Sequence, residues 1–79
     1  MNPELLAVVE YLRAFREEQD INKRVKEKTE LVISILTGSG QLAVEKALLE
    51  LEELNSADIS PYHRTQVWDM ISMLESIKK

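Results

Sequence analysis

His63 is the only histidine in the chain, and histidine is the residue type best suited to proton transfer and metal binding near neutral pH. A nucleophile would need such a base beside it, and a metal site in a helical bundle would need several inward carboxylates, commonly in Glu-x-x-His pairs. Position 60, three residues before His63, is a serine, so this pair is absent from the sequence. We therefore expect His63 to pack in a core with one ring nitrogen hydrogen-bonded, rather than to act as a base or a ligand.

Three glutamates lie close together at Glu50, Glu52 and Glu53, where paired carboxylates would suit general acid–base catalysis. They fall largely outside the apolar stripe of their segment, which is typical of a solvated helix face. The chain contains no cysteine, and therefore no thiolate nucleophile and no cysteine-ligated metal. The sequence predicts a protein that is not an enzyme and that binds no cofactor, metal ion or small-molecule ligand.

Arg64 and Trp68 are four residues apart, so their guanidinium and indole groups can stack along one edge of a helix. Arginine and tryptophan are also the residue types most enriched at binding hot spots. The alternative is an indole that only covers the rim of a small core. We take Arg64 and Trp68 as candidate interaction residues.

A basic run precedes the middle of the chain, with cations at Lys23, Arg24, Lys26 and Lys28. Cations near a helix N-terminus are disfavoured by the macrodipole, which favours a compensating anion such as a phosphate. The alternative is a pair of ordinary ion pairs along the helix, from Lys23 to Glu27 and from Lys26 to Glu30. Because the net charge of the chain is -4, nucleic-acid binding has only this local support.

Length and composition bound the class of protein. The 79 residues are expected to form one domain, 1-79, and the 44% apolar and 30% charged residues are in the globular range. The apolar runs, such as Leu31 to Ile33, are too short to span a membrane, and the first residues lack the basic segment of a secretory signal. We expect a cytoplasmic protein without membrane contact.

Helical periodicity predicts four helices, with approximate bounds at residues 3-19, 21-37, 41-54 and 61-78. Each has one apolar stripe that must be buried against the others. The expected fold is all-α, a four-helix up-and-down bundle made of two similar helical hairpins. A solenoid of paired helices is less favoured, because two units would leave both ends uncapped.

Capping residues set the expected helix ends. Asn2 and Ser60 each precede a proline, which is the pattern of an N-cap followed by proline at the first helical position. Asp20 is the expected N-cap of the second helix. The run Gly38-Ser39-Gly40 is expected to end that helix, because glycine readily adopts the left-handed conformation.

The second and fourth predicted helices align when one is shifted by 38 residues. The identities are Asp20 with Asp58, Ile21 with Ile59, Ile33 with Ile71, Ser34 with Ser72 and Leu36 with Leu74. The same shift sets His63 opposite the apolar Val25, which supports a core position for the histidine. The first and third helices match by apolar pattern with about one residue of slippage, so we predict an internal repeat of 1-38 and 39-79.

The chain has more apolar residues than one simple bundle can bury. Leu42 and Leu49 lie seven residues apart on the side of the third helix opposite its main stripe, and Leu31 and Ile35 widen the stripe of the second. Leu6 lies off the stripe of the first. A second apolar surface on a short chain favours association, most simply as a homodimer. The alternative is scattered exposed leucines, which are common on soluble proteins.

Residues 61-75 carry the pattern Arg-Thr-x-Val-Trp-x-x-Ile-Ser-x-Leu-Glu from Arg64 to Glu75. This segment resembles the C-terminal signature of uncharacterised protein family 0147, which are small archaeal all-helical proteins of unknown function. The stretch from Asp20 to Val25 is similar to a segment in the first half of that family. The resemblance implies a four-helix bundle in an archaeal cytoplasm, and it implies no known activity.

Together these features predict a non-enzymatic helical protein-interaction module that self-associates. The candidate surface is Leu42, Leu49, Leu31, Ile35, Arg64 and Trp68. The alternative function is an accessory factor that contacts RNA or a ribonucleoprotein through the basic run together with Arg64.

Overall fold

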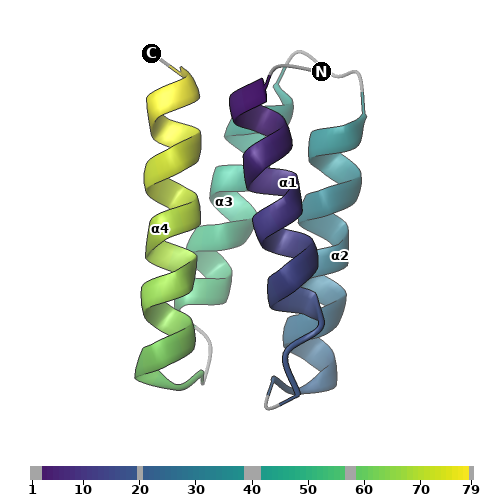
Figure 1. The fold of residues 1–79 in the computed structure, drawn as a ribbon, viewed down its shortest axis with the longest axis vertical. Helices are drawn as coiled ribbons and strands as arrows, with labels where there is room; N and C mark the ends of the chain where they lie inside the picture. The colour runs from purple at the N-terminus through teal and green to yellow at the C-terminus, as the bar shows by residue number, and fades with distance from the viewer. Residues whose placement is uncertain (1–2, 20, 39–41, 57–58, 79) are drawn as a thin grey trace.

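A computed structural model of the chain describes residues 3–19, 21–38, 42–56 and 59–78. These residues form four α-helices, and the all-α prediction is confirmed. The helices are α1 (Pro3–Arg16), α2 (Lys23–Thr37), α3 (Ala43–Asn55) and α4 (Pro61–Lys78). They lie roughly parallel to the long axis of a molecule that measures 31 × 19 × 19 Å (Figure 1).

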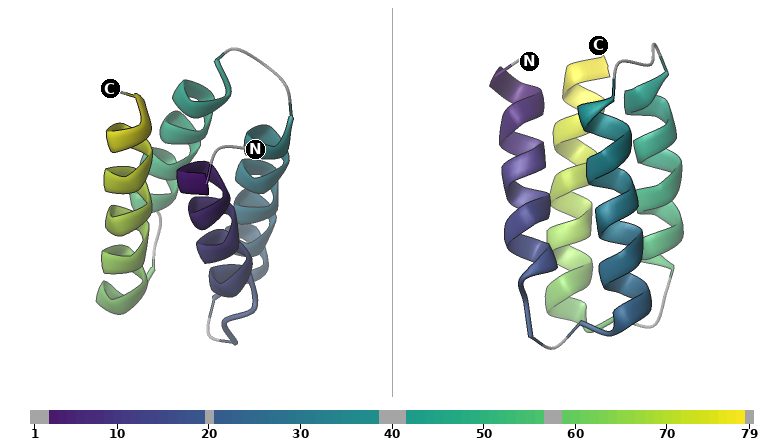
Figure 2. Two further views of the ribbon diagram at one scale, coloured as in Figure 1. Left: turned by 45° about the horizontal axis from the view of Figure 1, so that its top comes forward. Right: turned by 90° about the vertical axis from the view of Figure 1, so that its right-hand side faces the viewer.

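The helices alternate in direction and form a closed ring. Each helix contacts its two neighbours, so α1 packs on α2 and α4, and α3 packs on the same two helices. The helix α1 begins, and α4 ends, at the same end of the bundle (Figure 2). This is the up-and-down arrangement expected from two successive hairpins.

The core is built from one stripe on each helix. The buried residues of α1 are Val8, Val9, Leu12 and Phe15, and those of α3 are Ala47, Leu48, Leu51 and Leu54, each 39 positions later. The buried residues of α2 are Val25, Thr29, Val32, Ile33 and Leu36, and the residues 38 positions later in α4 are buried as well: His63, Val67, Met70, Ile71 and Leu74. The buried stripes of the two hairpins are thus offset by 39 positions between α1 and α3 and by 38 positions between α2 and α4.

Side-chain caps begin α2 and α4 at equivalent positions. The Oδ1 atom of Asn22 accepts a hydrogen bond from the Val25 amide at 2.9 Å, and the Oγ atom of Ser60 accepts one from the His63 amide at 3.3 Å. The Ser60 cap is therefore confirmed. The helix α2 begins two residues after its approximate expected start at residue 21, because the side chain of Asn22 serves as the cap. The expected caps Asp20 and Asn2 lie outside the described residues.

Two other helix ends differ from expectation. The helix α1 ends at Arg16 rather than at residue 19, because the amides of Glu17 and Glu18 turn back to carbonyls three residues earlier, at 3.1 Å each. The helix α3 runs from Ala43 rather than from residue 41, and it ends at Asn55, one residue later than expected. The amide of Ser56 then donates to the carbonyls of the last turn. Only the ends of the elements shift, and the buried stripes stay in place.

Gly38 does not adopt the left-handed conformation that the sequence suggested for the Gly38-Ser39-Gly40 run, and Ser39 and Gly40 lie outside the described residues. Its φ and ψ angles are -77° and 173°, and its amide donates to the carbonyls of Ser34 at 3.1 Å and Ile35 at 3.2 Å. The helix is thus ended by extended backbone, a conformation open to any residue. A Cβ atom at this position would meet those two carbonyl oxygens at 3.5 and 3.4 Å, which is ordinary van der Waals contact.

Replacing Gly38 by alanine is therefore expected to stabilise the protein by roughly 0.4 to 1 kcal/mol, because alanine restricts the unfolded chain without straining the folded one. Gly38→Pro is the matched control, since proline suits this φ but removes the bonded amide, and it should be destabilising. Urea unfolding of the variants measures both effects. A loss of more than about 1 kcal/mol in Gly38→Ala would show that residue 38 needs the freedom of glycine.

Candidate interaction surface

His63 lies in the core at the end of the bundle where α4 begins. Its side chain is 1% exposed, and its ring packs edge-on against Phe15 of α1 with the ring centres 5.4 Å apart. The Nδ1 atom donates to Oε1 of Gln66 at 2.9 Å, and the Gln66 amide nitrogen reaches Oε1 of Glu18 at 3.4 Å. His63 thus occupies the core position that the repeat alignment predicts, where it helps to join α4 to α1.

Within the described residues, no group of three or more histidines, aspartates and glutamates is placed to hold a metal ion. In the same part of the chain, no helix combines the length and the apolar character needed to cross a membrane.

The seam between α1 and α4 is closed by polar contacts. The hydroxyl of Tyr11 donates to Oδ2 of Asp69 at 3.2 Å, and Gln66 and Glu18 meet nearby. Partial burial, followed by the charge and hydrogen bond of Asp69, raises the pKa of Tyr11 above its usual value of 10.0. This seam presents polar atoms along the side of the molecule.

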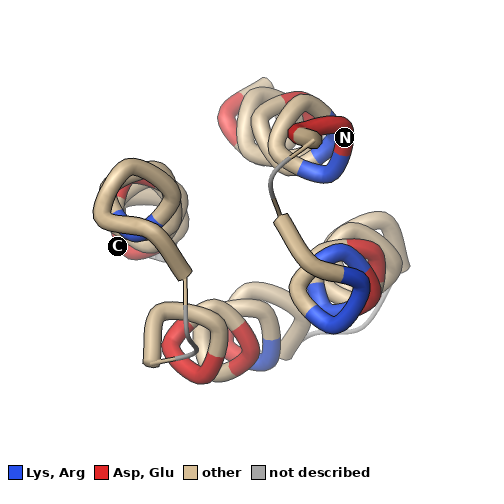
Figure 3. Tube along the Cα trace, turned by 90° about the horizontal axis from the view of Figure 1, so that it is seen from below, with Lys and Arg blue, Asp and Glu red and all other residues tan. Residues whose placement is uncertain are grey.

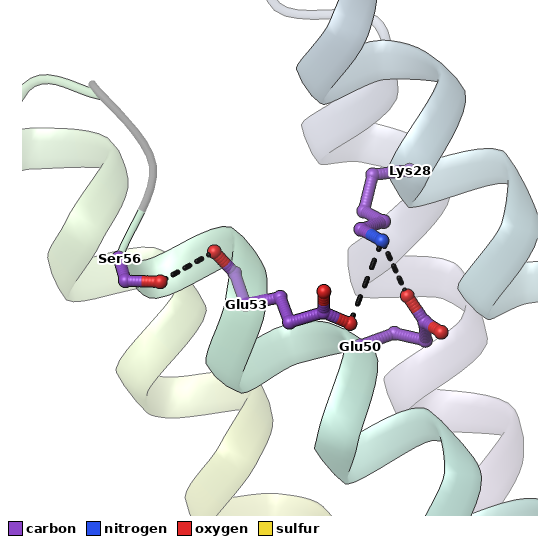
Figure 4. Close-up of polar contacts among 4 residues, drawn as sticks. All are labelled: Lys28, Glu50, Glu53 and Ser56. Carbon is purple, nitrogen blue, oxygen red and sulfur yellow. Dashed lines mark hydrogen bonds and ion pairs between the residues drawn. The ribbon is translucent and has the colours of Figure 1, made fainter.

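The seam between α2 and α3 is closed by a lysine shared between two glutamates. Lys28 of α2 extends across the seam, with Nζ on Oε1 of Glu50 and 3.6 Å from Oε2 of Glu53 (Figure 4). The hydroxyl of Ser56 holds the end of the same helix by donating to the Glu53 backbone carbonyl at 2.9 Å. Oε1 of Glu50 is shielded from solvent, and the ion pair with Lys28 satisfies it. Glu50 is therefore a seam residue, whereas the neighbouring glutamates are exposed as expected.

The hydrogen bond from Lys28 to Glu50 raises the pKa of Lys28 above its usual 10.5, with smaller contributions from the charges of both glutamates. A raised folded-state pKa means that the pair stabilises the fold fully below pH 10.5 and loses this contribution as the pH rises through the folded-state pKa.

Lys28→Met is thus expected to lower the melting temperature at neutral pH, and its deficit relative to the unsubstituted protein should shrink above pH 10.5. Lys23→Met serves as the control because Lys23 is exposed and makes no ion pair with a described residue. Thermal melts followed by circular dichroism at several pH values test this. Equal melting temperatures for the two variants at pH 7 would contradict a stabilising role for the pair.

The basic run is smaller in the structure than in the sequence. Because Lys28 pairs with glutamates of α3, the exposed cations of the run are Lys23, Arg24 and Lys26. In the end view of Figure 3, the blue segments of α2 mark this basic run. The expected pairs of Lys23 with Glu27 and of Lys26 with Glu30 are not formed, and none of the three cations makes an ion pair within the described residues. Exposed pairs of this kind contribute little, so their absence costs the helix little.

Arg64 does not extend this patch. It lies on α4, which is diagonal to α2 in the ring and is separated from it by α1 and α3. An open groove of about 650 Å³ does adjoin the patch, with Asn22, Arg24, Glu27, Lys28, Glu53 and Ser56 among its lining residues. Acidic and basic groups alternate around it, so its electrostatics favour no single ligand charge.

Leu42 and Leu49 lie on the outer side of α3 and are 55% and 63% exposed. Leu31 of α2 is 44% exposed beside the ion-paired seam, where it lines the groove. Ile35 differs from expectation: it is partly buried and packs against the core, because it shares the α3-facing side of α2 with Lys28. The exposed apolar surface over α2 and α3 therefore consists of Leu31, Leu42 and Leu49, which we call the leucine face.

Trp68 lies on the other side of α3 from Leu31. It is 53% exposed on α4, and Arg64 beside it is exposed too. Among the described residues the aromatic contacts join Phe15 to His63 and Tyr62 to His63, and the expected stacking of Arg64 on Trp68 is not formed. The helices α2 and α4 begin, and α3 ends, at the same end of the bundle (Figure 1). At about 1.5 Å rise per residue, Leu31, Leu49 and Trp68 all lie about 9 to 12 Å from that end, and therefore at one level of the bundle.

The repeated burial pattern shows which of these leucines are exceptional. The position in α4 equivalent to Leu31 is Asp69, and the position in α1 equivalent to Leu49 is Glu10. Both equivalents are exposed and charged. At these two positions the α2–α3 side carries a leucine where the other side carries an acid, and the reverse holds at the exposed Leu6 and Trp68, whose equivalents are Glu45 and Glu30.

Comparison with known proteins found no match to any family model, to any curated protein or to any solved structure. The resemblance of residues 61-75 to uncharacterised protein family 0147 therefore stays a prediction.

Proposed function

We propose that this protein is a non-enzymatic helical interaction module, and that it binds a second copy of itself through the leucine face. The observation that carries the proposal is the exposure of Leu49 on the outer side of α3, where the equivalent residue of α1 is Glu10. A small bundle gains nothing in its own core from that leucine, whereas burial against a partner removes its apolar surface from water. The proposal includes a cytoplasmic location. The resemblance of residues 61-75 to uncharacterised protein family 0147 supports an archaeal origin.

Self-association also suits the size of the chain. A core from 79 residues rarely supplies more than about 3 to 5 kcal/mol of net stability, and oligomerisation is a common way to add to it. Binding of folded chains to one another stabilises the folded state by mass action. A contact formed by the leucine face would therefore contribute to stability as well as to recognition.

Light scattering on a gel-filtration column tests the proposal. Leu49→Glu places a charge in the proposed contact and is expected to weaken self-association at least about 100-fold, which leaves a monomer of 9.1 kDa. Leu6→Glu is the matched control, because it makes the same change at a 46% exposed leucine on α1, away from the leucine face. Circular dichroism confirms that both variants fold. If the two variants and the unsubstituted protein have the same mass, the leucine face is not the contact.

The alternative, an accessory factor that contacts RNA, rests on the three exposed cations at the start of α2. Three phosphate contacts would make the logarithm of the affinity for single-stranded RNA fall with a slope of about -2 against the logarithm of the salt concentration. A labelled RNA that does not bind at low salt would remove this alternative.

A further inference from the structure

The outer side of α3 has a repeating seven-residue spacing that suits pairing with a copy of itself. Leu42, Leu49 and Ser56 follow one another at seven-residue intervals, with Leu42 and Ser56 as the capping residues at the two ends of α3, and two turns of helix bring each nearly above the last. Leu49 lies midway. A twofold axis through Leu49 and perpendicular to α3 would therefore set Leu49 against Leu49 of the second copy, and Leu42 against Ser56 of the second copy.

The charges beside Leu49 differ between the two edges of this outer side. Glu53 marks the edge toward α2, because it reaches Lys28, and Lys46 lies on the same edge, seven residues earlier. Glu45 and Glu52 lie on the opposite edge, toward α4. In an antiparallel pairing, Lys46 would face Glu53 of the second copy, and Glu45 would face Glu52 of the second copy.

These charges decide on which side of α3 the partner lies. An antiparallel contact centred on the α2 edge gains two opposite-charge pairs, because each copy pairs its Lys46 with Glu53 of the other. The edge with Glu45 and Glu52 is then left at the solvated rim, where like charges are screened. Leu31 lies on that same side and would be covered. In a parallel pairing, Lys46 would face Glu45 of the second copy and Glu53 would face Glu52 of the second copy. Each edge of the contact would then hold one attractive and one repulsive pair, and moving the partner toward α2 or α4 could not keep one without the other.

We infer that a second copy of this chain docks antiparallel on α3 toward α2, with Leu49 at the twofold axis and Lys46 facing Glu53 of the second copy. This inference rests on the proposed self-association and adds its orientation and register. Trp68 and Arg64 lie outside the contact. The pairing is closed, because the same surface of both copies is used and none remains for a third.

Single-cysteine variants report the orientation directly, since the chain has no cysteine of its own. Under mild oxidation Leu49→Cys should form a disulfide-linked dimer at least tenfold faster than Ala14→Cys, an exposed position on α1, which is diagonal to α3. Leu42→Cys alone should link no faster than that control, because its two copies would lie about 20 Å apart at 1.5 Å rise per residue. A mixture of Leu42→Cys with Ser56→Cys should link quickly. Rapid linking of Leu42→Cys to itself would overturn the antiparallel arrangement.

Charge reversal gives a second readout that keeps all the leucines. Lys46→Glu is expected to weaken self-association about tenfold, and the double variant with Glu53→Lys should restore it, because opposite charges again face each other. Sedimentation measures the dissociation constants. A double variant that associates no more tightly than Lys46→Glu alone would overturn the register.

The two proposals fail in different ways. If the protein is a dimer that Leu49→Glu disrupts, but the cysteine and charge variants do not follow the pattern above, only the orientation is wrong. If the unsubstituted protein has a mass of 9.1 kDa at every concentration, the proposed self-association and the inference fail together.

Discussion

Leu12→Ala is expected to leave much of the protein unfolded at 25 °C. Leu12 is fully buried in the middle of the α1 stripe. Removing a buried leucine side chain costs about 2 to 5 kcal/mol, since the apolar contacts are lost and the cavity collapses only in part. A core of this size rarely supplies more than about 3 to 5 kcal/mol in total, so one such change approaches the whole stability.

The folded fraction of Leu12→Ala is measured by circular dichroism and urea unfolding. Leu6→Ala on the same helix is the matched control, because Leu6 is 46% exposed and its truncation should change stability by less than about 0.5 kcal/mol. Both substitutions have the same effect on helix propensity, so their difference isolates burial. If Leu12→Ala were as stable as Leu6→Ala, the assigned core face of α1 would be wrong.

His63→Ala is expected to lower the free energy of unfolding by about 2 to 4 kcal/mol. The change removes a buried ring that packs on Phe15 and leaves Oε1 of Gln66 without its imidazole donor. We expect this loss of stability to be smaller only than that of Leu12→Ala or of an equivalent substitution at another buried leucine. Urea unfolding gives the difference directly.

Two further variants separate packing from hydrogen bonding at this position. Gln66→Ala keeps the imidazole in place and should cost only about 1 kcal/mol, the usual contribution of one hydrogen bond. His63→Val should be more stable than His63→Ala, because valine occupies the equivalent position, Val25, in α2. If His63→Ala were within about 0.5 kcal/mol of the unsubstituted protein, His63 would not be a core residue, and its chemistry would have to be considered again.

The core could be predicted from sequence because helical periodicity alone defines a buried stripe. Residues equivalent to one another in the two hairpins, such as Val25 and His63, are buried together even though one is apolar and the other polar. No knowledge of the neighbouring helix is needed for this step. The bundle architecture then follows from burying four stripes against one another.

Helix ends were harder to predict, because several residues there can perform the same task. Both Asp20 and Asn22 are residue types suited to an N-cap, and the side chain of Asn22 caps α2. Residues 17–19 are good helix formers, yet the hairpin reverses there and α1 stops at Arg16. Gly38 ends α2 without using the left-handed conformation that glycine makes available.

Contacts between helices could not be predicted from spacing along one helix. The sequence suggests pairs of cations with Glu27 and Glu30, whereas the lysine that forms an ion pair is Lys28, with glutamates of α3. Which side of α2 faces α3 depends on the order of helices around the ring. That order also explains Ile35, which lies seven residues after Lys28 on the same side and is partly buried there.

The leucine face was predicted in part. Leu42 and Leu49 were recognised because they lie opposite the main stripe of their helix, and both are exposed. The comparison of Leu31 with Asp69 and of Leu49 with Glu10 was available in the sequence, but it requires both alignment shifts, and burial in the structure fixes these.

Sedimentation equilibrium of the unsubstituted protein over a wide concentration range tests the central claim most directly. The account predicts that the average mass rises with concentration from the 9.1 kDa of one chain toward the mass of two chains and no further. A mass that stays at 9.1 kDa at millimolar concentration would contradict the claim that the leucine face binds a second copy.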